Sequence, residues 1–178
     1  DSGGGARGGP RTGPAVTDRR SSLLDATITV IARRGVRGLR VQEVAAEAEV
    51  SVPLIYHYFG SRGGLLEAAL AAVHERAGRY TQASADPRAS ARDQLTARLL
   101  GELQDTEEVR TTSSAWGELR WASVFDEGLR PPVAALTAEW VAEVAHLIDR
   151  LQVEEGVTEV DRRDPEATAE ILIALVEG

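Results

Sequence analysis

Apolar residues recur at spacings of three and four along almost the whole chain, and this spacing constrains the fold more than any other feature of the sequence. Leu24, Ile28 and Ile31 show it near the start, and Leu95 and Leu99 show it in the middle. These spacings place side chains on one face of an α-helix, whereas a half-buried strand needs strict alternation, which we do not find. The 178 residues, of which 43% are hydrophobic, can bury a sizeable core. The sequence therefore predicts an all-α protein.

Capping and breaking residues divide this pattern into separate helices. The expected helices cover residues 17–35, 41–48, 51–59 and 62–80, then segments around Leu95 and Trp116, residues 131–155, and a last helix that opens at Pro165. Ser51 is an N-cap candidate for the third helix, and Pro53 lies in its first turn, where a missing N–H costs little. Two short helices joined by a tight turn are typical of a helix-turn-helix, whose second helix enters the DNA major groove.

The amino-acid composition excludes several classes of functional site. The chain has no Cys, which excludes a disulfide framework, a thiolate metal site and a cysteine nucleophile. His57, His74 and His146 lack the spacing of metal ligands, and no Gly-x-Ser-x-Gly elbow is present. We therefore expect no enzyme activity, no metal and no cofactor. No run approaches the roughly 20 apolar residues that span a bilayer, so we expect no membrane partner and a cytoplasmic location.

Charge is distributed unevenly along the chain. Residues 1–62 carry nine arginines against six acidic residues, a net charge of +3, although the whole chain has a net charge of −8. The remaining residues carry −11. Because binding to a polyanion depends on the local field rather than on total charge, the front of this acidic chain could contact nucleic acid.

Residues 38–62, with the sequence GLRVQEVAAEAEVSVPLIYHYFGSR, closely resemble the DNA-binding signature of the TetR family of transcriptional regulators. The strongest part is VSVPLIYHYF at residues 50–59, followed by Ser61 and Arg62. Together with the preceding helix, the resemblance covers roughly residues 17–75. It implies an all-α fold with an N-terminal three-helix helix-turn-helix domain and a C-terminal helical bundle. The rest of the chain is similar to the family only in being helical.

The resemblance also implies which residues bind DNA. They are Arg40, Gln42, Ser51, Val52, Pro53, Leu54, Tyr56, His57 and Arg62. Ser51 would cap the recognition helix, and Tyr56 matches a tyrosine that grips a phosphate, to which its hydroxyl can donate. Arg62 stands where the family usually has a lysine aimed at the DNA backbone. Gln42 occupies a position that often reaches a base or a phosphate, and His57 would face base edges or the adjacent backbone.

Three departures from the family pattern bear on the fold. Glu49 stands in the turn where members commonly have Gly, and a non-Gly residue with positive φ costs about 1 kcal/mol or more. Arg40 stands where Thr often caps the second helix, so the cap lacks an acceptor, although Glu43 could reach back to a backbone N–H. Gly63 and Gly64 replace a charged pair and weaken the start of the fourth helix by about 1 kcal/mol each relative to alanine.

The second half of the chain is expected to hold the effector and the dimer contacts. The helix after Pro131 has an apolar stripe wider than one core contact needs, which indicates a second partner surface. The resemblance implies a dimer formed through the last helices, with the candidate interface residues Trp140, Val144, Leu147, Leu151, Leu172 and Leu175. It also implies a ligand cavity, with the candidate lining residues Leu99, Trp116, Glu118, Arg120, Trp121 and Phe125.

These observations predict four segments and one function. The segments are a disordered, glycine-rich tail at 1–14, a helix-turn-helix DNA-binding domain at 15–62, a connecting helix at 63–80, and a ligand-binding and dimerisation domain at 81–178. The expected function is a ligand-responsive transcriptional regulator, a repressor that binds an inverted-repeat operator on double-stranded DNA as a homodimer. An unidentified small molecule would release it. The alternative is a helical protein-interaction module without specific DNA binding.

Overall fold

The computed structural model describes residues 16–83, 86 and 88–177, and these residues form eight α-helices and no strand. The helices are α1 (Val16–Gly38), α2 (Val41–Glu47), α3 (Val52–Phe59), α4 (Arg62–Ala83), α5 (Ala91–Gly101), α6 (Glu107–Ser123), α7 (Arg130–Glu154) and α8 (Pro165–Glu177). The all-α fold class is therefore confirmed. The predicted tail at 1–14 lies outside the described residues. Among the eight helices of the described part, none is long and apolar enough to cross a bilayer.

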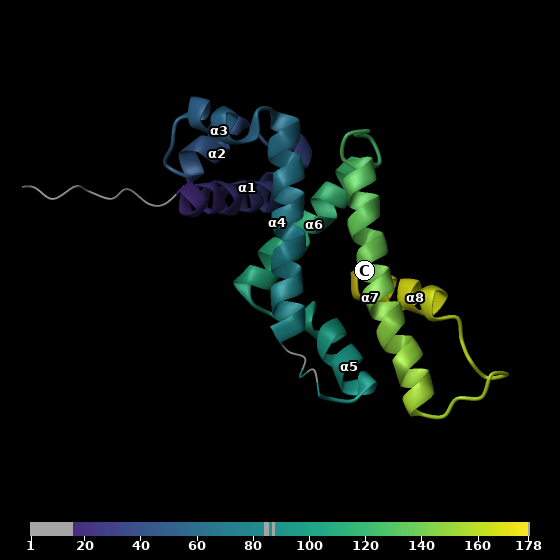
Figure 1. Ribbon diagram of the computed structural model, residues 1–178. Coiled ribbons are helices and arrows are strands. Elements are labelled where there is room, and N and C mark those ends of the chain that lie inside the picture. The colour runs from purple at the N-terminus through teal and green to yellow at the C-terminus, as the bar shows by residue number, and fades with distance from the viewer. Residues whose placement is uncertain (1–15, 84–85, 87, 178) are drawn as a thin grey trace, which may run out of the picture.

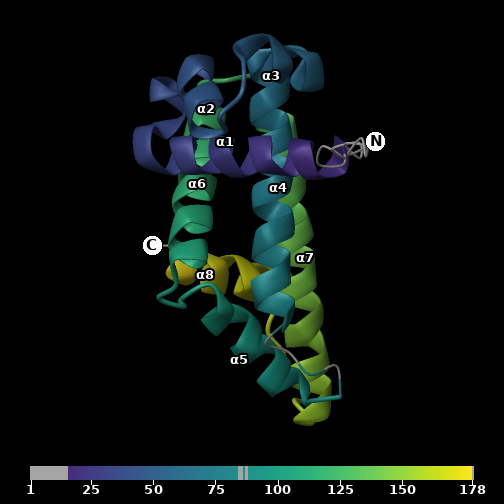
Figure 2. The ribbon, with the colours of Figure 1, turned by 90° about the vertical axis from the view of Figure 1, so that its left-hand side faces the viewer.

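The first three helices form a group at one end of α4 (Figure 1). From that group α4 runs toward α5, while α7 is a second long helix beyond α6. In the side view, α1 lies across α4 and α6, and α5 and α8 lie away from the α1–α3 group (Figure 2). The helix-turn-helix is thus held at one end of the molecule, and the last helices are held at a distance from it.

Two clusters of buried side chains hold these helices together. The first joins α1, α2, α3 and α4 to α6 and the start of α7, and it includes Ile28, Ile55, Leu66 and Leu119. The second joins α5, α7 and α8. The buried core therefore does not separate into two parts near residue 80, because α6 packs against α1 and α4. The four segment limits remain a prediction.

The helix ends agree closely with the expected ones. The backbone of α1 is non-helical at Gly35, where φ is 71°, at the stop that the sequence predicts. α2 begins after Arg40, whose side chain makes no capping hydrogen bond, as expected from the missing acceptor. Glu43 does not replace that cap, because its Oε2 atom is buried without a hydrogen-bond partner among the described residues.

The turn between α2 and α3 has the backbone conformation that the sequence predicts. Glu49 has a φ of 53°, which is in the left-handed region. The backbone N–H of Val50 donates to the carbonyl oxygen of Ala45 at 2.9 Å and closes the turn. Because the Cβ of an L-residue crowds the following carbonyl in this region, Glu49 is locally strained.

We expect Glu49→Gly to raise the free energy of unfolding by about 1 kcal/mol, because glycine adopts the left-handed region without the Cβ penalty. Urea unfolding followed by circular dichroism measures the change. The matched control is Ala46→Gly, at an exposed site with helical backbone in α2. Glycine there should lower the free energy of unfolding by about 1 kcal/mol. A loss of stability at both sites would show that the turn does not favour glycine.

Candidate DNA-binding surface and ligand cavity

The recognition helix α3 presents one face to the core and the other to solvent. Ile55 is 1% exposed and belongs to the first buried cluster, whereas Tyr56 is 44% exposed. Pro53 and His57 are exposed as well. Since residues three or four apart share one side of a helix, Pro53 lies on the same side as Tyr56 and His57. The outer face of α3 therefore carries a phenol hydroxyl and an imidazole that are open to a partner.

The residues at the start of α3 are placed differently from the expectation. Ser51 is exposed and has the extended backbone of an N-cap, but its side chain makes no capping hydrogen bond, so the expected hydroxyl cap is not formed. Val52 and Leu54 are half-buried, and Val52 packs against the first cluster. Part of the surface expected to face base edges is therefore used inside the protein.

Arg62 has an internal partner. Its Nη2 donates to the carbonyl oxygen of Val36 at 2.6 Å, which ties the start of α4 to the end of α1. At the same turn the backbone N–H of Gly64 donates to the Oγ of Ser61 at 3.0 Å, so Ser61 caps α4. Arg62 thus fixes the junction of the two helices, and the other N–H groups of its guanidinium remain for a phosphate.

Other basic and polar groups flank this surface. Arg40 and Gln42 are exposed at the start of α2. The guanidinium carbon of Arg20, in α1, lies 5.5 Å from the ring centroid of Phe59, at the end of α3. This cation–π contact holds a positive charge beside the recognition helix. Sequence reasoning missed it because no spacing rule links residues so far apart.

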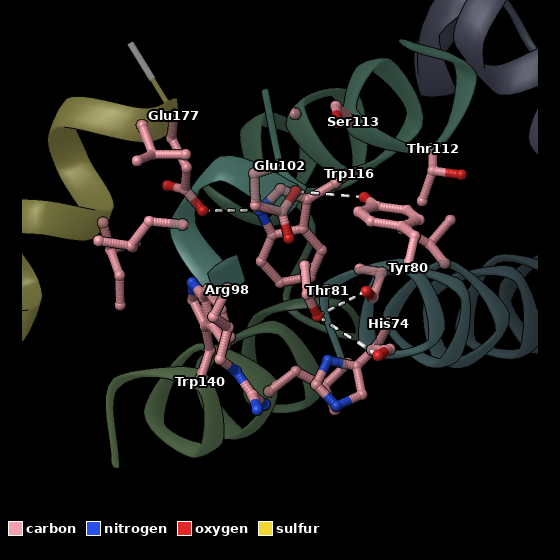
Figure 3. A pocket seen from close by; sticks show the side chains of 18 of the residues that line it. His74, Tyr80, Thr81, Arg98, Glu102, Thr112, Ser113, Trp116, Trp140 and Glu177 are labelled. Atoms are coloured by element: carbon pink, nitrogen blue, oxygen red, sulfur yellow. Dashed lines mark hydrogen bonds between the residues drawn. The ribbon is translucent and has the colours of Figure 1, made fainter. Parts of the chain in front are cut away.

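A cavity of about 230 Å³ lies between α4, α5, α6, α7 and α8 (Figure 3). Its lining combines aromatic rings with carboxylates and basic groups, namely His74, Tyr80, Arg98, Glu102, Trp116, Arg120, Trp140, Glu143 and Glu177. Aliphatic side chains, including Val73, Leu99 and Ile173, complete the wall. In the described part of the chain, no group of three or more His, Asp or Glu side chains could hold a metal ion.

The lining contains three of the six residues proposed for it from the sequence, which are Leu99, Trp116 and Arg120. On α6, Trp116 and Arg120 are four residues apart and so share one face. Tyr80 and Glu102 also line the cavity and were missed. The sequence marks Tyr80 only as the end of a helix, and Glu102 lies at the end of α5, where periodicity gives no signal.

The other three proposed lining residues do not line the cavity. Glu118 is exposed on the side of α6 that faces α1, where a Cβ built on Gly35 would lie 2.5 Å from its carboxylate. Trp121 and Phe125 are 63% and 70% exposed and contact each other edge to face, with ring centroids 5.9 Å apart. The expectation failed because these residues lie on faces of α6 and of the following turn that point away from the cavity.

Two of the three carboxylates in the lining have cationic partners. Glu177 accepts a hydrogen bond from the indole N–H of Trp116 at 3.0 Å and pairs with Arg120, which joins the end of α8 to α6. Glu143 of α7 pairs with Arg98 of α5. A cation–π contact adds to the second link, because the Arg98 guanidinium carbon lies 5.1 Å from the ring centroid of Trp140, also in α7. The contacts thus tie α8 to α6 and α5 to α7 around the cavity.

Glu102 is the third carboxylate, and its environment is unfavourable for a negative charge. Its Oε2 accepts a hydrogen bond from the hydroxyl of Tyr80 at 3.2 Å. Burial raises the pKa of Glu102 above its usual value, although the hydrogen bond from Tyr80 and the charge of Arg98 act in the opposite direction. Burial also raises the pKa of Tyr80, and the charge of Glu102 adds to that shift. The position of Glu102 at the C-terminal end of α5 further disfavours a negative charge.

We expect Glu102→Gln to raise the free energy of unfolding at pH 7. Because the pKa of Glu102 is higher in the folded than in the unfolded chain, the stability linked to this group is fully present at low pH and is lost as pH rises through the folded pKa. Glutamine stays neutral and can still accept from Tyr80. The difference in the free energy of unfolding between Glu102→Gln and the native chain should therefore shrink as pH falls below the usual pKa range of glutamate. Thermal unfolding at several pH values measures this difference. The exposed Glu170 of α8 supplies the control, since Glu170→Gln should change stability little at any pH.

Half of the residues proposed for the dimer interface are used inside the protein. Val144 and Leu147 are 0% and 7% exposed in the second cluster, and Trp140 lines the cavity. The wide apolar stripe on α7 is covered by α5 and α8 of the same chain. Its width therefore reflects two intramolecular neighbours, and these three residues are not available to a partner.

The remaining interface candidates lie nearer the surface. Leu151 and Leu172 are half-buried against the second cluster, and Leu175 is 74% exposed. Ile171, which the sequence analysis did not select, is 62% exposed on the same helix. Because residues four apart share one face, Ile171 and Leu175 form an exposed apolar strip along α8.

Comparison with known proteins identifies the family. The family model for bacterial regulatory proteins of the tetR family matches residues 23–69, which contain α2 and α3. A protein from Rhodococcus sp., described as a TetR-family transcriptional regulator, is 47% identical in sequence, with a TM-score of 0.79 over 92% of this chain and 85% of that chain. This chain belongs to the TetR family of transcriptional regulators. The predicted family and its layout, a helix-turn-helix followed by a helical bundle, are thereby confirmed.

Two further relatives are more distant from this TetR-family chain. The HTH-type transcriptional regulator BetI of Paraburkholderia phytofirmans is 33% identical over 105 residues, which are 56% of this chain and 54% of that protein. The match therefore spans about half the length of that relative. A transcriptional regulator from Saccharomonospora viridis, solved in complex with choline, is 25% identical, with a TM-score of 0.78 over 91% of this chain and 83% of that chain.

Proposed function

We propose that this chain is a ligand-responsive repressor that binds an inverted-repeat operator as a homodimer and leaves it when a small molecule fills the cavity. The observation that carries the proposal is the outer face of α3, a helix anchored by buried Ile55 that exposes Tyr56 and His57. A helix that docks into the hydrophobic groove of a partner protein presents apolar anchors, whereas this face carries a phenol hydroxyl and an imidazole that can hydrogen-bond to phosphates and base edges.

Each exposed residue of the helix-turn-helix has a role in this proposal. Tyr56 donates its hydroxyl to a phosphate oxygen, and Arg40 adds charge at the start of α2. Gln42 and His57 reach base edges and so select the sequence. The remaining candidates contact the DNA backbone or pack beside it, and they are Ser51, Val52, Pro53, Leu54 and Arg62. Residues 15–62 then form the DNA-binding domain, 63–80 connect it, and 81–178 bind the ligand and the second copy.

A dimer is part of the proposal because one recognition helix covers only one half-site. A two-fold pair of chains places two such helices on successive turns of the duplex. The exposed strip of Ile171 and Leu175 on α8, flanked by half-buried Leu172 and Leu151, supplies an apolar surface for a second copy. This is narrower than the interface expected from the sequence, since α7 contributes fewer free residues.

The link between the cavity and the DNA end is α6. Trp116 and Arg120 of this helix line the cavity, while Leu119 of the same helix belongs to the cluster that contains α1. A ligand that displaces α6 would therefore also displace the helices that carry α3. The choline complex of the Saccharomonospora viridis relative supports a small-molecule effector for a chain of this fold.

Selection of bound sequences from a random duplex pool tests the proposal. We expect the full chain to enrich an inverted repeat, because a two-fold dimer reads the same half-site twice. Binding should weaken steeply as salt rises, since each neutralised phosphate releases counterions. Enrichment of a single half-site would refute binding as a two-fold dimer. No enrichment of any sequence would favour the alternative, a protein-interaction module.

A further inference from the structure

We propose that the cavity takes an organic cation, with its charge against the carboxylate of Glu102 and its alkyl groups against the rings of Tyr80 and Trp116. The inference rests on the proposed function, because it names the class of effector for that same cavity. Three observations support it: the pairing of the charged groups in the lining, the arrangement of the rings, and two buried polar atoms that have no hydrogen-bond partner among the described residues.

The pairing of charges leaves one carboxylate in need of a cation. Arg98 is paired with Glu143 and Arg120 with Glu177, so the two guanidinium groups of the lining are already matched. In the part of the chain that the structure describes, Glu102 forms no ion pair, and its Oε2 has a hydrogen bond from Tyr80 only. Among the carboxylates and guanidinium groups of the lining, Glu102 is therefore the one that is left without an oppositely charged partner.

Glu102 is also held where its ionised form is disfavoured. Its carboxylate is partly removed from water and lies at the C-terminal end of α5, where the neutral hydroxyl of Tyr80 donates a hydrogen bond to it. Arg98 acts on it through its charge but is paired elsewhere. A bound cation would supply the favourable partner that the protein does not, whereas a bound anion would add a second negative charge beside it.

The aromatic rings suit the same ligand class. Tyr80 and Trp116 both belong to the lining, and they come from different helices, α4 and α6 (Figure 3). Aromatic faces attract cations because of their quadrupole, and an alkylated ammonium group combines that attraction with apolar contact. The ring of Trp140 already has the guanidinium of Arg98 over it, which shows a cation–π contact of this kind within the lining itself.

Two polar atoms of the lining residues remain without partners. The Nε of Arg98 and the Oγ1 of Thr112 are buried and have no hydrogen-bond partner among the described residues, and Thr112 is only 1% exposed. Buried polar groups are normally hydrogen-bonded, so unpaired ones in the wall of a cavity call for a polar group on the occupant. A hydroxyl or carbonyl oxygen on the cation would meet that need.

Calorimetric titration of the full chain tests the proposal with two pairs of probes. Choline is compared with 3,3-dimethyl-1-butanol, and acetylcholine with 3,3-dimethylbutyl acetate, so that each cation has a neutral partner of nearly the same shape. We expect at least one cation to bind about tenfold or more tightly than its neutral partner. Glu102→Gln should remove most of that preference and leave the affinity of the neutral partner unchanged, while Glu170→Gln should leave both unchanged.

The proposal is overturned if neither cation binds more tightly than its neutral partner, or if Glu102→Gln keeps the preference. Loss of folding cannot produce the expected result, because Glu102→Gln is expected to be more stable than the native chain at pH 7. The binding test needs no DNA, so it can fail separately from the proposed function. A cation that binds through Glu102 but leaves operator affinity unchanged would refute effector release and support the ligand class.

Discussion

Gly64→Ala is expected to lower the free energy of unfolding by about 1–3 kcal/mol, the usual cost of overpacking a closely packed site. A Cβ at this position would lie 2.3 Å from the carbonyl oxygen of Phe59. That oxygen is a backbone atom at the end of α3, so it cannot turn aside as a long side chain can. Relief would require the recognition helix to move relative to α4, which should weaken DNA binding as well.

The neighbouring Gly63 provides the matched comparison. A Cβ there would meet only the Oγ of Ser61, at 3.6 Å, which is an ordinary contact. Gly63→Ala should therefore raise the free energy of unfolding by up to about 1 kcal/mol through helix propensity. Urea unfolding of both variants measures whether each substitution lowers or raises the free energy of unfolding. If both variants were stabilised equally, the close approach of α3 and α4 would be disproved.

Tyr56→Phe is expected to reduce DNA affinity by about tenfold or more at each half-site, because a hydrogen bond to a charged group contributes about 1.5 kcal/mol or more. The loss should be the same for every sequence, since a phosphate carries no sequence information. The half-exposed ring remains in place, so the fold should be unaffected. Fluorescence anisotropy with the selected operator and with its base-pair variants measures the effect.

Gln42→Ala and His57→Ala should behave differently from Tyr56→Phe. Both residues are exposed and are proposed to reach base edges, so their loss should change which base pair is preferred at particular positions. The same anisotropy series, repeated over a range of salt, compares the three variants. If all three variants lost the same affinity on every DNA sequence, the assignment of Tyr56 to a phosphate and of Gln42 and His57 to base edges would be refuted.

The sequence predicted the helices well because its signals for them are local. Spacings of three and four marked α1 and α4, and Pro165 marked the start of α8. The strain at Glu49 was also foreseen, since family members carry glycine there. In contrast, the view that Gly63 and Gly64 only weaken α4 was incomplete, because the contact between Gly64 and Phe59 depends on the path of the turn.

The cavity was harder to predict because it depends on which side each helix turns inward. An aromatic residue on an amphipathic helix gives the same pattern whether it lines a cavity, as Trp116 does, or faces solvent, as Trp121 does. Similarly, the apolar stripe that contains Val144 could not show whether its second neighbour belongs to the same chain or to another. Those outcomes are decided by tertiary packing, which no spacing within one helix records.

The shared packing of α6 with α1 limits how this protein can be re-engineered. A chimeric regulator joined at residue 80 would separate Leu119 from the α1 side chains in its own cluster and leave both faces in water. Transplanting the operator preference into another scaffold would therefore require α6 and the start of α7 to travel with the first four helices. The segments that have to be transferred together in such a graft are therefore not contiguous in the sequence.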